Sequence, residues 1–367
     1  MAKVSVIIPS YNHEKYVGYA LESVLNQTFQ DFEIIVTDDH STDQTIKEIK
    51  KFKDPRIKLF FSNKNRGVCV AINNCLLHAK GEYVSPLNSD DAFFPDKLEK
   101  LVKYLDSHSD VGAVFSQVQM INEEGIGIPD SSHFHGRMNL LENRGRFQWL
   151  NYFFYNCRWL WHPSMMMRKK IYDDIGNHNP CLAQIHDFDI GIRLSLKYEL
   201  SIIQEKLTKF RIRAGEMNAS AATPKAIVRS MFEFSHVLKH YLLIRDVEEF
   251  LKIFSQSQTK YKDIIDDELI PFYVARQALE VEHVFHQKFA LDVLFDLLQN
   301  KKIVNKLREK YKFDYSDFIK LTGKYDLYHV GHIAYQEALI KKLQVENNRL
   351  KTPINQIKSL IKEFIDR

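Results

Sequence analysis

Three polar clusters follow short apolar runs in the first part of the chain: PSYN at 9–12, DDHSTD at 38–43 and NSDD at 88–91. Carboxylate oxygens are ligands that Mg²⁺ and Mn²⁺ prefer, and these ions keep positions open for phosphate oxygens. An ion held there would neutralise charge as a nucleotide diphosphate leaves. One Asp-Asp pair alone is a weak signal, because Asp is common in turns and helix caps. Three such clusters together favour a metal-assisted nucleotide site.

The elements that position these clusters can be predicted from the apolar pattern. Apolar, β-branched runs predict buried strands, and apolar residues at helical spacing predict the helices between them. This alternation predicts a parallel-centred α/β sheet with helices on both faces. Ligands bind beyond the carboxyl ends of such strands, so we expect the three clusters to converge at one edge. The expected strands are 4–8, 32–37, 57–61, 83–87 and 111–117, and the expected helices are 15–27, 42–52, 68–79 and 95–107.

Beyond the expected sheet the chain changes character twice. Residues 118–224 are irregular and hold all three tryptophans. From about 225 to 330 the pattern is helical and rich in Lys, Glu, Phe and Leu, without repeats or low-complexity segments. We therefore expect a first domain over 1–224, a helical domain over 225–330 and a C-terminal helix over 331–367.

The C-terminal helix carries apolar residues at the spacing of a coiled coil. Intervals of three and four residues alternate along the seam, and Asn347 at an a position commonly fixes register and chain number. Glu346 and Lys351 are placed for an interchain ion pair, but Pro353 should break or kink the helix near Leu350. A helix packed on its own domain and a helix at a membrane surface are the alternatives. The seam residues are Ile340, Leu343, Asn347, Leu350, Ile354, Ile357, Ile361 and Phe364.

The composition argues against several classes of protein. The net charge of +4 is too small and too evenly spread to predict nucleic-acid binding. The four cysteines lack CxxC spacing, so we expect neither a disulfide framework nor a zinc site, and a reducing compartment fits. No apolar run approaches the ~18 residues of a membrane helix, and the N-terminal apolar stretch is too short for a signal peptide. We expect a cytoplasmic protein, with peripheral contact at the inner membrane face left open.

Three stretches of the sequence resemble the catalytic core of family 2 glycosyltransferases: VSVIIPSYN, QTFQDFEIIVTDDHSTD and NRGVCVAINNCLLHAKGEYVSPLNSDD. The likeness covers about residues 1–215 and is similar in particular to inverting transferases of bacterial spore-coat, capsule and O-antigen synthesis. It implies a GT-A fold, a Rossmann-like and mostly parallel α/β sheet, followed here by an α-helical C-terminal region. It also implies transfer of a sugar from a UDP-sugar to a hydroxyl of a glycan or lipid-linked acceptor, with Mn²⁺ or Mg²⁺.

The resemblance assigns a donor-side role to residues in all three clusters. Asp39 would contact the base, and Asp90 and Asp91 would bind the metal. The usual Asp-x-Asp-Asp motif reads Asn-Ser-Asp-Asp here, so Asn88 is left with ribose binding, and metal affinity is expected to be weaker than usual. The nucleotide-binding residues implied by position are Pro9, Tyr11, Asn12, Asp39, Arg66, Gly67, Asn73, Asn88 and Asp90.

The resemblance also places the catalytic base in HDFDIGIRL, residues 186–194. An inverting transferase needs one carboxylate to take the proton of the acceptor hydroxyl. Position in the family's Asp-x-x-x-x-x-Arg segment favours Asp187, with Asp189 as its rival; an N-cap role for Asp187 is compatible with this. Trp161, His162 and His186 would lie on the sugar and acceptor side, although a structural role is equally ordinary for His162 and tryptophan is more often simply part of the core.

Two arginines and the overall class of the protein allow further interpretations. Arg211 and Arg213 follow an expected strand; we favour a solvated surface pair over approach to the diphosphate. A nucleotidyltransferase would need a Gly-rich phosphate loop near the N-terminus, and PSYN stands there instead. A non-catalytic nucleotide-sugar-binding or scaffold subunit is the main alternative, because Asn88 replaces the first Asp of the usual metal motif. The presence of Asp90 and Asp187 argues against this alternative. The expected partners are a UDP-sugar, a glycan or lipid-linked acceptor and further copies of this chain through its C-terminal helix, with no nucleic acid.

Overall fold

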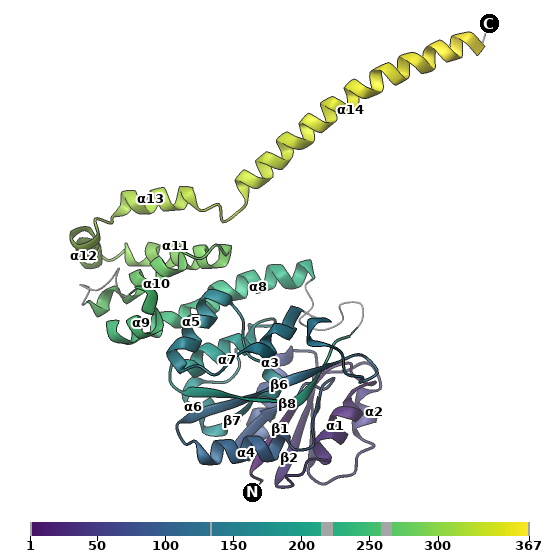
Figure 1. The fold of residues 1–367 in the computed structure, drawn as a ribbon, viewed down its shortest axis with the longest axis vertical. Helices are drawn as coiled ribbons and strands as arrows, with labels where there is room; N and C mark the ends of the chain where they lie inside the picture. Colours follow the sequence, from purple (N-terminus) through teal and green to yellow (C-terminus); the bar gives the residue numbers. More distant parts are fainter. Residues whose placement is uncertain (1, 133, 214–222, 258–265, 366–367) are drawn as a thin grey trace. The chain divides into compact units, whose positions relative to one another are not determined.

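The computed structural model describes residues 2–132, 134–213, 223–257 and 266–365 (Figure 1). Its contacts divide the chain into two compact units, Met1–Ile270 and Pro271–Arg367. Residues 225–270 fall in the first of these units, and the domain boundaries at 224 and 330 stay predictions.

The described strands of the first unit form one eight-stranded mixed sheet in the order β3-β2-β1-β4-β7-β6-β8-β5. The half formed by β3, β2, β1 and β4 is parallel throughout. In the other half β6 and β8 are parallel to each other, whereas β7 and β5 pair antiparallel with their neighbours. The strands are β1 (Val4–Ser10), β2 (Phe32–Asp38), β3 (Ile57–Phe61), β4 (Tyr83–Pro86), β5 (Ala92–Phe93), β6 (Val111–Ile121), β7 (Met166–Arg168) and β8 (Glu199–Arg211).

The parallel half confirms the expected strands 4–8, 32–37, 57–61 and 83–87. Its register places the polar clusters at the same edge of the sheet. Every residue of β1 and β2 is buried, which explains their nearly continuous apolar sequence. Ser10 at the end of β1 is the register partner of Asp38 at the end of β2. Because parallel strands end at the same edge, the residues after each strand are delivered to one place.

Helices cover both faces of this sheet, because successive side chains of a strand point to opposite faces. Val4, Val6 and Ile8 of β1 share one core cluster with α1 (Val17–Leu25) and α4 (Lys97–Ser107). On the opposite face α3 (Val68–His78) packs over β1 and β2, with the Cys75 thiol on Ile35 O at 3.4 Å. The short helix α2 (Thr45–Ile49) adds Ile49 to the first cluster.

The remaining helices of the first unit follow the irregular middle of the chain. Their bounds are α5 (Arg146–Asn156), α6 (Lys169–Ile175), α7 (His186–Ser195), α8 (Pro224–Val237) and α9 (Val247–Ile253). Short 3₁₀ turns lie at Asp130–Ser132, Phe134–Leu140, His162–Ser164, Leu238–Leu243, Ser255–Ser257 and Asp267–Leu269.

The second unit is helical, and aromatic contacts join its first part. Phe272 lies 5.1 Å from Tyr311 and 5.4 Å from Phe313 between ring centroids, and the hydroxyls of Tyr273 and Tyr311 are 3.0 Å apart. Its helices are α10 (Ile270–Ala278), α11 (Val284–Leu297), α12 (Lys301–Tyr311), α13 (Tyr315–Lys324) and α14 (Val330–Ile365).

Helix α14 runs without interruption through Pro353, so the expected break near Leu350 is wrong. Helices tolerate an interior proline when they bend or give up the affected hydrogen bond. The described seam residues Ile340, Leu343, Ile357 and Ile361 are all more than half exposed. None of the described helices has both the length and the apolar character needed to cross a membrane.

Candidate functional site

The clusters after β1 and β2 are joined through Asn12. The backbone N–H of Asn12 donates to Ser41 Oγ at 2.9 Å, and Thr42 N–H donates to Asn12 Oδ1 at 2.8 Å. Asn12 has a positive φ of 52°, a conformation that asparagine adopts more readily than most residues. The buried Asp38 carboxylate accepts from Ser41 N–H and Ser41 Oγ, which holds the second loop in place.

Asp39 links this pair of clusters to the loop before α3. Its carboxylate accepts from the backbone N–H of Arg66 at 3.0 Å and from that of Gly67 at 2.7 Å. Gly67 caps α3 with φ 92°, a conformation that suits glycine. A carboxylate has about four acceptor sites, so Asp39 can still accept a further N–H.

The third cluster, after β4, is joined to the first through His13. The Nδ1 atom of His13 lies 2.7 Å from Ser89 Oγ. The predicted convergence of the three clusters is therefore confirmed, and we call residues 9–13, 38–43, 65–67 and 88–91 the strand-end site. His13 itself was missed, because a single histidine after PSYN gives no local signal of its role.

The two carboxylates of NSDD differ sharply in their surroundings. Asp91 is 1% exposed and accepts from Arg211 N–H and from Asn88 Nδ2, each at 2.8 Å. Burial and the neighbouring charge of Asp90 raise the pKa of Asp91 well above its usual value. The Asp90 side chain is 10% exposed, and its Oδ2 lies 3.4 Å from Arg213 Nε and 3.8 Å from His13 Nε2.

Arg211 and Arg213 are not the solvated surface pair that we expected. Arg211 is 3% exposed, donates through Nε to Asp90 O at 2.8 Å, and lies 4.9 Å from the Tyr16 ring centroid. The Arg213 guanidinium lies 3.1 Å from His13 Nε2 as well as beside Asp90. Strand β8 is not an edge strand in the structure, because β5 pairs beyond it.

This donor set fits a hard divalent ion in a limited way. Mg²⁺ is often held by one or two carboxylates together with substrate phosphates and water. Asp90 offers such a carboxylate, whereas both oxygens of Asp91 are already engaged within the protein. The Arg213 guanidinium already lies beside Asp90, so Arg213 and a bound metal ion would share the Asp90 carboxylate or compete for it.

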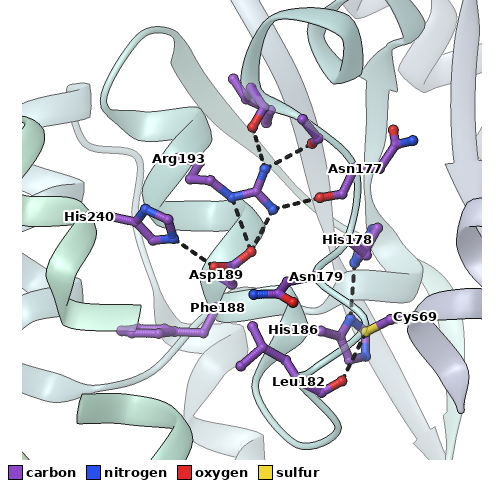
Figure 2. Close-up of polar contacts among 12 residues, drawn as sticks. Cys69, Asn177, His178, Asn179, Leu182, His186, Phe188, Asp189, Arg193 and His240 are labelled. Carbon is purple, nitrogen blue, oxygen red and sulfur yellow. Dashed lines mark hydrogen bonds and ion pairs between the residues drawn. The ribbon is translucent and has the colours of Figure 1, made fainter. Parts of the chain in front are cut away.

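The predicted base, Asp187, and its rival, Asp189, also have distinct surroundings; Figure 2 shows those of Asp189. Asp189 is buried and bound by Arg193 Nη2 at 2.5 Å and by His240 Nε2 at 2.7 Å. Burial raises the pKa of Asp189, but the hydrogen bond from His240 and the charge of Arg193 outweigh burial and lower it. Asp187 is half-buried and accepts from the adjacent Phe188 N–H at 2.8 Å. Burial raises the pKa of Asp187 above its usual value.

Distant residues hold the segment that carries Asp187. The Arg193 guanidinium donates to the carbonyls of Ile175, Gly176 and Asn177 (Figure 2). The Asn73 amide brackets the backbone of His178, donating to its carbonyl at 2.8 Å and accepting from its N–H at 3.0 Å. We call residues 175–187 the framed segment.

Glu233 of α8 completes this frame. It is 1% exposed and accepts from the backbone N–H groups of three consecutive residues, Ala183, Gln184 and Ile185, at 2.9–3.1 Å. Sequence reasoning missed Glu233, since a single glutamate on a helix gives no sign of its partners. Asn73, predicted near the nucleotide, has both amide atoms engaged with the framed segment; its nucleotide role stays a prediction.

The residues predicted on the acceptor side lie around a group of imidazoles. His162 is 7% exposed and its ring centroid lies 5.5 Å from those of both His178 and His186. Burial lowers the pKa of His162 to about 3, so it is neutral. Trp161 packs beside Val118 and Met120, and its Nε1 donates to Asn139 Oδ1 at 3.1 Å. Contact of Trp161 with a sugar stays a prediction.

Comparisons with known proteins point to one family. The family model described as Glycosyl transferase family 2 matches residues 5–176. An uncharacterised glycosyltransferase from Methanocaldococcus jannaschii is 32% identical over 218 residues, 57% of this chain and 70% of that protein. A UDP-Glc:alpha-D-GlcNAc-diphosphoundecaprenol beta-1,3-glucosyltransferase from Escherichia coli is 34% identical over 123 residues, 34% of this chain and 48% of that protein.

A solved structure resembles the fold over most of the chain. The crystal structure of S. aureus TarS 1–349 in complex with UDP-GlcNAc has a TM-score of 0.55 and 21% identity, covering 92% of this chain and 92% of that one. At this identity the likeness establishes the fold alone. It confirms the predicted GT-A class, an α/β sheet followed by a helical C-terminal region.

Proposed function

Because this chain belongs to family 2 of the glycosyltransferases, we propose that it transfers a sugar from a UDP-sugar to a hydroxyl of a glycan or lipid-linked acceptor, with inversion. The observation that carries this proposal is the union of three polar clusters in the strand-end site, with a separate half-buried carboxylate on the framed segment. A UDP-glucose substrate in the name of a relative and UDP-GlcNAc in the TarS complex support the choice of donor. Bacterial surface polysaccharide synthesis is the proposed setting.

On the donor side, we assign the nucleotide to the strand-end site. The Tyr11 ring is 42% exposed and so is available to stack on the base, while Asp39 accepts a base N–H. Asn12, Arg66, Gly67 and Asn88 are proposed to surround the ribose and diphosphate, with Pro9 beneath.

Mn²⁺ or Mg²⁺ is the proposed cofactor, with Asp90 as the protein ligand and Asp91 as its buried support. When bound, such an ion would neutralise charge on the departing diphosphate. Arg213 lies beside Asp90 and is placed to add positive charge to the same region. The aspartate pair therefore has divided roles, one binding and one positioning.

Asp187 is the proposed base. Its carboxylate takes the proton of the acceptor hydroxyl while that oxygen forms a bond to the anomeric carbon. The bond from this carbon to the diphosphate breaks at the same time, and UDP leaves with the electron pair. Asp189 is a poor candidate, because Arg193 and His240 already hold it. His162, His186 and Trp161 are the proposed sugar and acceptor contacts.

The first test is calorimetric titration of the full chain with UDP, GDP and CDP, in Mn²⁺ and then in EDTA. We expect UDP to bind selectively and more tightly with metal, followed by release of UDP from a UDP-sugar. Binding of UDP with no sugar ever released would favour the scaffold alternative instead. Failure of all three nucleotides to bind would overturn the proposal.

We also propose that α14 joins copies of this chain. The described apolar seam residues Ile340, Leu343, Ile357 and Ile361 are exposed along a helix of 36 residues, and burying them against a second copy would remove that apolar surface from water. A chain ending at Tyr335 should have a lower oligomer mass in light scattering and an unchanged affinity for UDP. An unchanged mass would remove the coiled coil. Peripheral membrane contact through the lysines of α14 is the alternative, tested by flotation with anionic vesicles.

A further inference from the structure

A cysteine and two histidines meet on the side of the framed segment that faces α3. Cys69 is the second residue of α3, His178 follows α6, and His186 opens α7 (Figure 2). One ligand atom from each lies within 4.8 Å of the others, and the two Nδ1 atoms are 3.2 Å apart. Cys69 and His178 are buried and His186 is half-buried.

We propose that Cys69, His178 and His186 bind a zinc-class divalent ion. Thiolate and imidazole ligands select Zn²⁺ over Mg²⁺ or Mn²⁺, which prefer oxygen. Bond lengths of about 2.3 Å to sulfur and about 2.0 Å to nitrogen place tetrahedral ligands roughly 3.4 Å apart. The two Nδ1 atoms, 3.2 Å apart, already have about that separation, and the thiol lies within 4.8 Å of the imidazole ligand atoms. Sequence spacing predicted no zinc site, because these ligands are far apart in the chain.

A second observation concerns the same group of imidazoles. The Nε2 atoms of His178 and His162 are buried and have no hydrogen-bond partner among the described residues. Buried polar atoms without a partner are uncommon in native proteins. Both rings lie against His186, with centroids 5.2 Å and 5.5 Å from its own. His162 is thus a third imidazole beside the three proposed ligands, and the position left open on the ion is proposed for water.

The surrounding frame holds the ligands as a metal site requires. Asn73 fixes the backbone of His178, and Glu233 fixes the three residues before His186. The Cys69 thiol donates to Leu182 O at 3.0 Å, which brings it to the same segment. Binding of the ion would displace the thiol proton to solvent and leave a thiolate ligand.

The position suggests what the ion does. His186 adjoins Asp187, so an ion bound to His186 would fix the first turn of α7 and the direction of Asp187. This consequence for catalysis rests on the proposed function, whereas binding of the ion does not. His178 is therefore a positioning residue, and His186 would act in the same way through Nδ1 while its Nε2 is left for the acceptor contact proposed above.

The test uses the full chain, stripped with EDTA and titrated with Co²⁺. We expect a near-ultraviolet thiolate-to-cobalt band and visible bands of tetrahedral cobalt, both lost when Zn²⁺ is added. The chain purified with zinc should hold one equivalent by mass spectrometry of the metal. Absence of the thiolate band, or a zinc content near zero, would overturn the proposal.

Variants identify the ligands. Cys69→Ser and His178→Ala should each lower zinc content at least 10-fold, while Cys75→Ser serves as the matched control in the same helix. The Cys75 thiol contacts Thr37 and Ile35 and lies in the core of α3 against the sheet. Loss of the cobalt band in Cys75→Ser but not in Cys69→Ser would contradict the assignment, and circular dichroism melting would report any loss of fold.

A last pair of measurements separates this site from the proposed function. Asp90→Asn should keep the thiolate-to-cobalt band, because the band can arise only from a bound cysteine. UDP binding measured in Mg²⁺ should be unchanged in Cys69→Ser. If the chain binds cobalt but no nucleotide, the metal-site proposal stands and the glycosyltransferase proposal is overturned. If it binds UDP but no cobalt, the metal-site proposal is overturned and the glycosyltransferase proposal stands.

Discussion

The strand-end site and the framed segment are assembled by different means. In the strand-end site, Asn12 and His13 bond to residues after neighbouring strands, so the order and register of the sheet dictate the arrangement. The framed segment instead depends on side chains from distant positions, with Glu233 48–50 residues and Asn73 105 residues away. The strand-end site therefore follows from the sheet, whereas the framed segment depends on contacts made outside it, and we expect the two to respond separately to substitution.

The sharpest test of this division is Asp187→Asn. We expect turnover, measured as UDP release, to fall by at least ~10²-fold, because a positioned base is lost. UDP affinity by calorimetry should stay within a few-fold, because Asp187 lies outside the strand-end site. Near-normal turnover would remove Asp187 from the role of base.

Asp189→Asn is the matched control two residues away. Its carboxylate is bound by Arg193 and His240 in a buried pair, so losing its charge should lower the free energy of unfolding by about 3 kcal/mol. Asp187→Asn should leave the urea midpoint nearly unchanged. If Asp189→Asn lost turnover at full stability, the roles of the two aspartates would be exchanged.

A second test moves to the strand-end site with Asp90→Asn. Losing a charge-assisted contact is worth about 1.5–3 kcal/mol, so UDP affinity in Mn²⁺ should fall by about 10-fold to 100-fold. EDTA should weaken UDP binding in the native chain and have little further effect in the variant. If both chains responded equally to EDTA, another residue would be the metal ligand.

The two regions also differ in how far their structure could be predicted from the sequence. Strands β1–β4 and their polar ends were predictable, since a buried apolar run and the residues after it are local features. The convergence of the clusters followed from the general behaviour of parallel sheets. The antiparallel insertion of β7 was not predictable, because a strand of three residues, Met166–Arg168, carries too little pattern to fix its direction.

Long-range partners account for most of what sequence missed. Arg211 and Arg213 were expected at the surface, whereas both contact Asp90, about 120 residues away in the chain, and Arg213 also contacts His13. Glu233, His240 and His178 act through residues far away in the chain, for which no local signal exists. Pro353 is a case in which a local signal misled. Proline usually breaks a helix, yet α14 continues through this residue.

The smallest expected effect tests the frame itself through Glu233→Gln. The amide keeps one acceptor oxygen but loses the charge that three backbone N–H groups share, so we expect the free energy of unfolding to fall by about 1–2 kcal/mol. Turnover should fall several-fold, because Asp187 follows the segment that Glu233 holds. UDP affinity should not change.

Glu248→Gln on α9 is the control for Glu233→Gln, since its carboxylate is 77% exposed and an exposed ion pair with Lys252 contributes little. It should leave stability within about 0.5 kcal/mol and turnover unchanged. The comparison between the two regions fails if Glu233→Gln weakens UDP binding as much as it slows turnover. In that case the frame and the sheet would act as one unit, and changes in the acceptor side would not be independent of the nucleotide side.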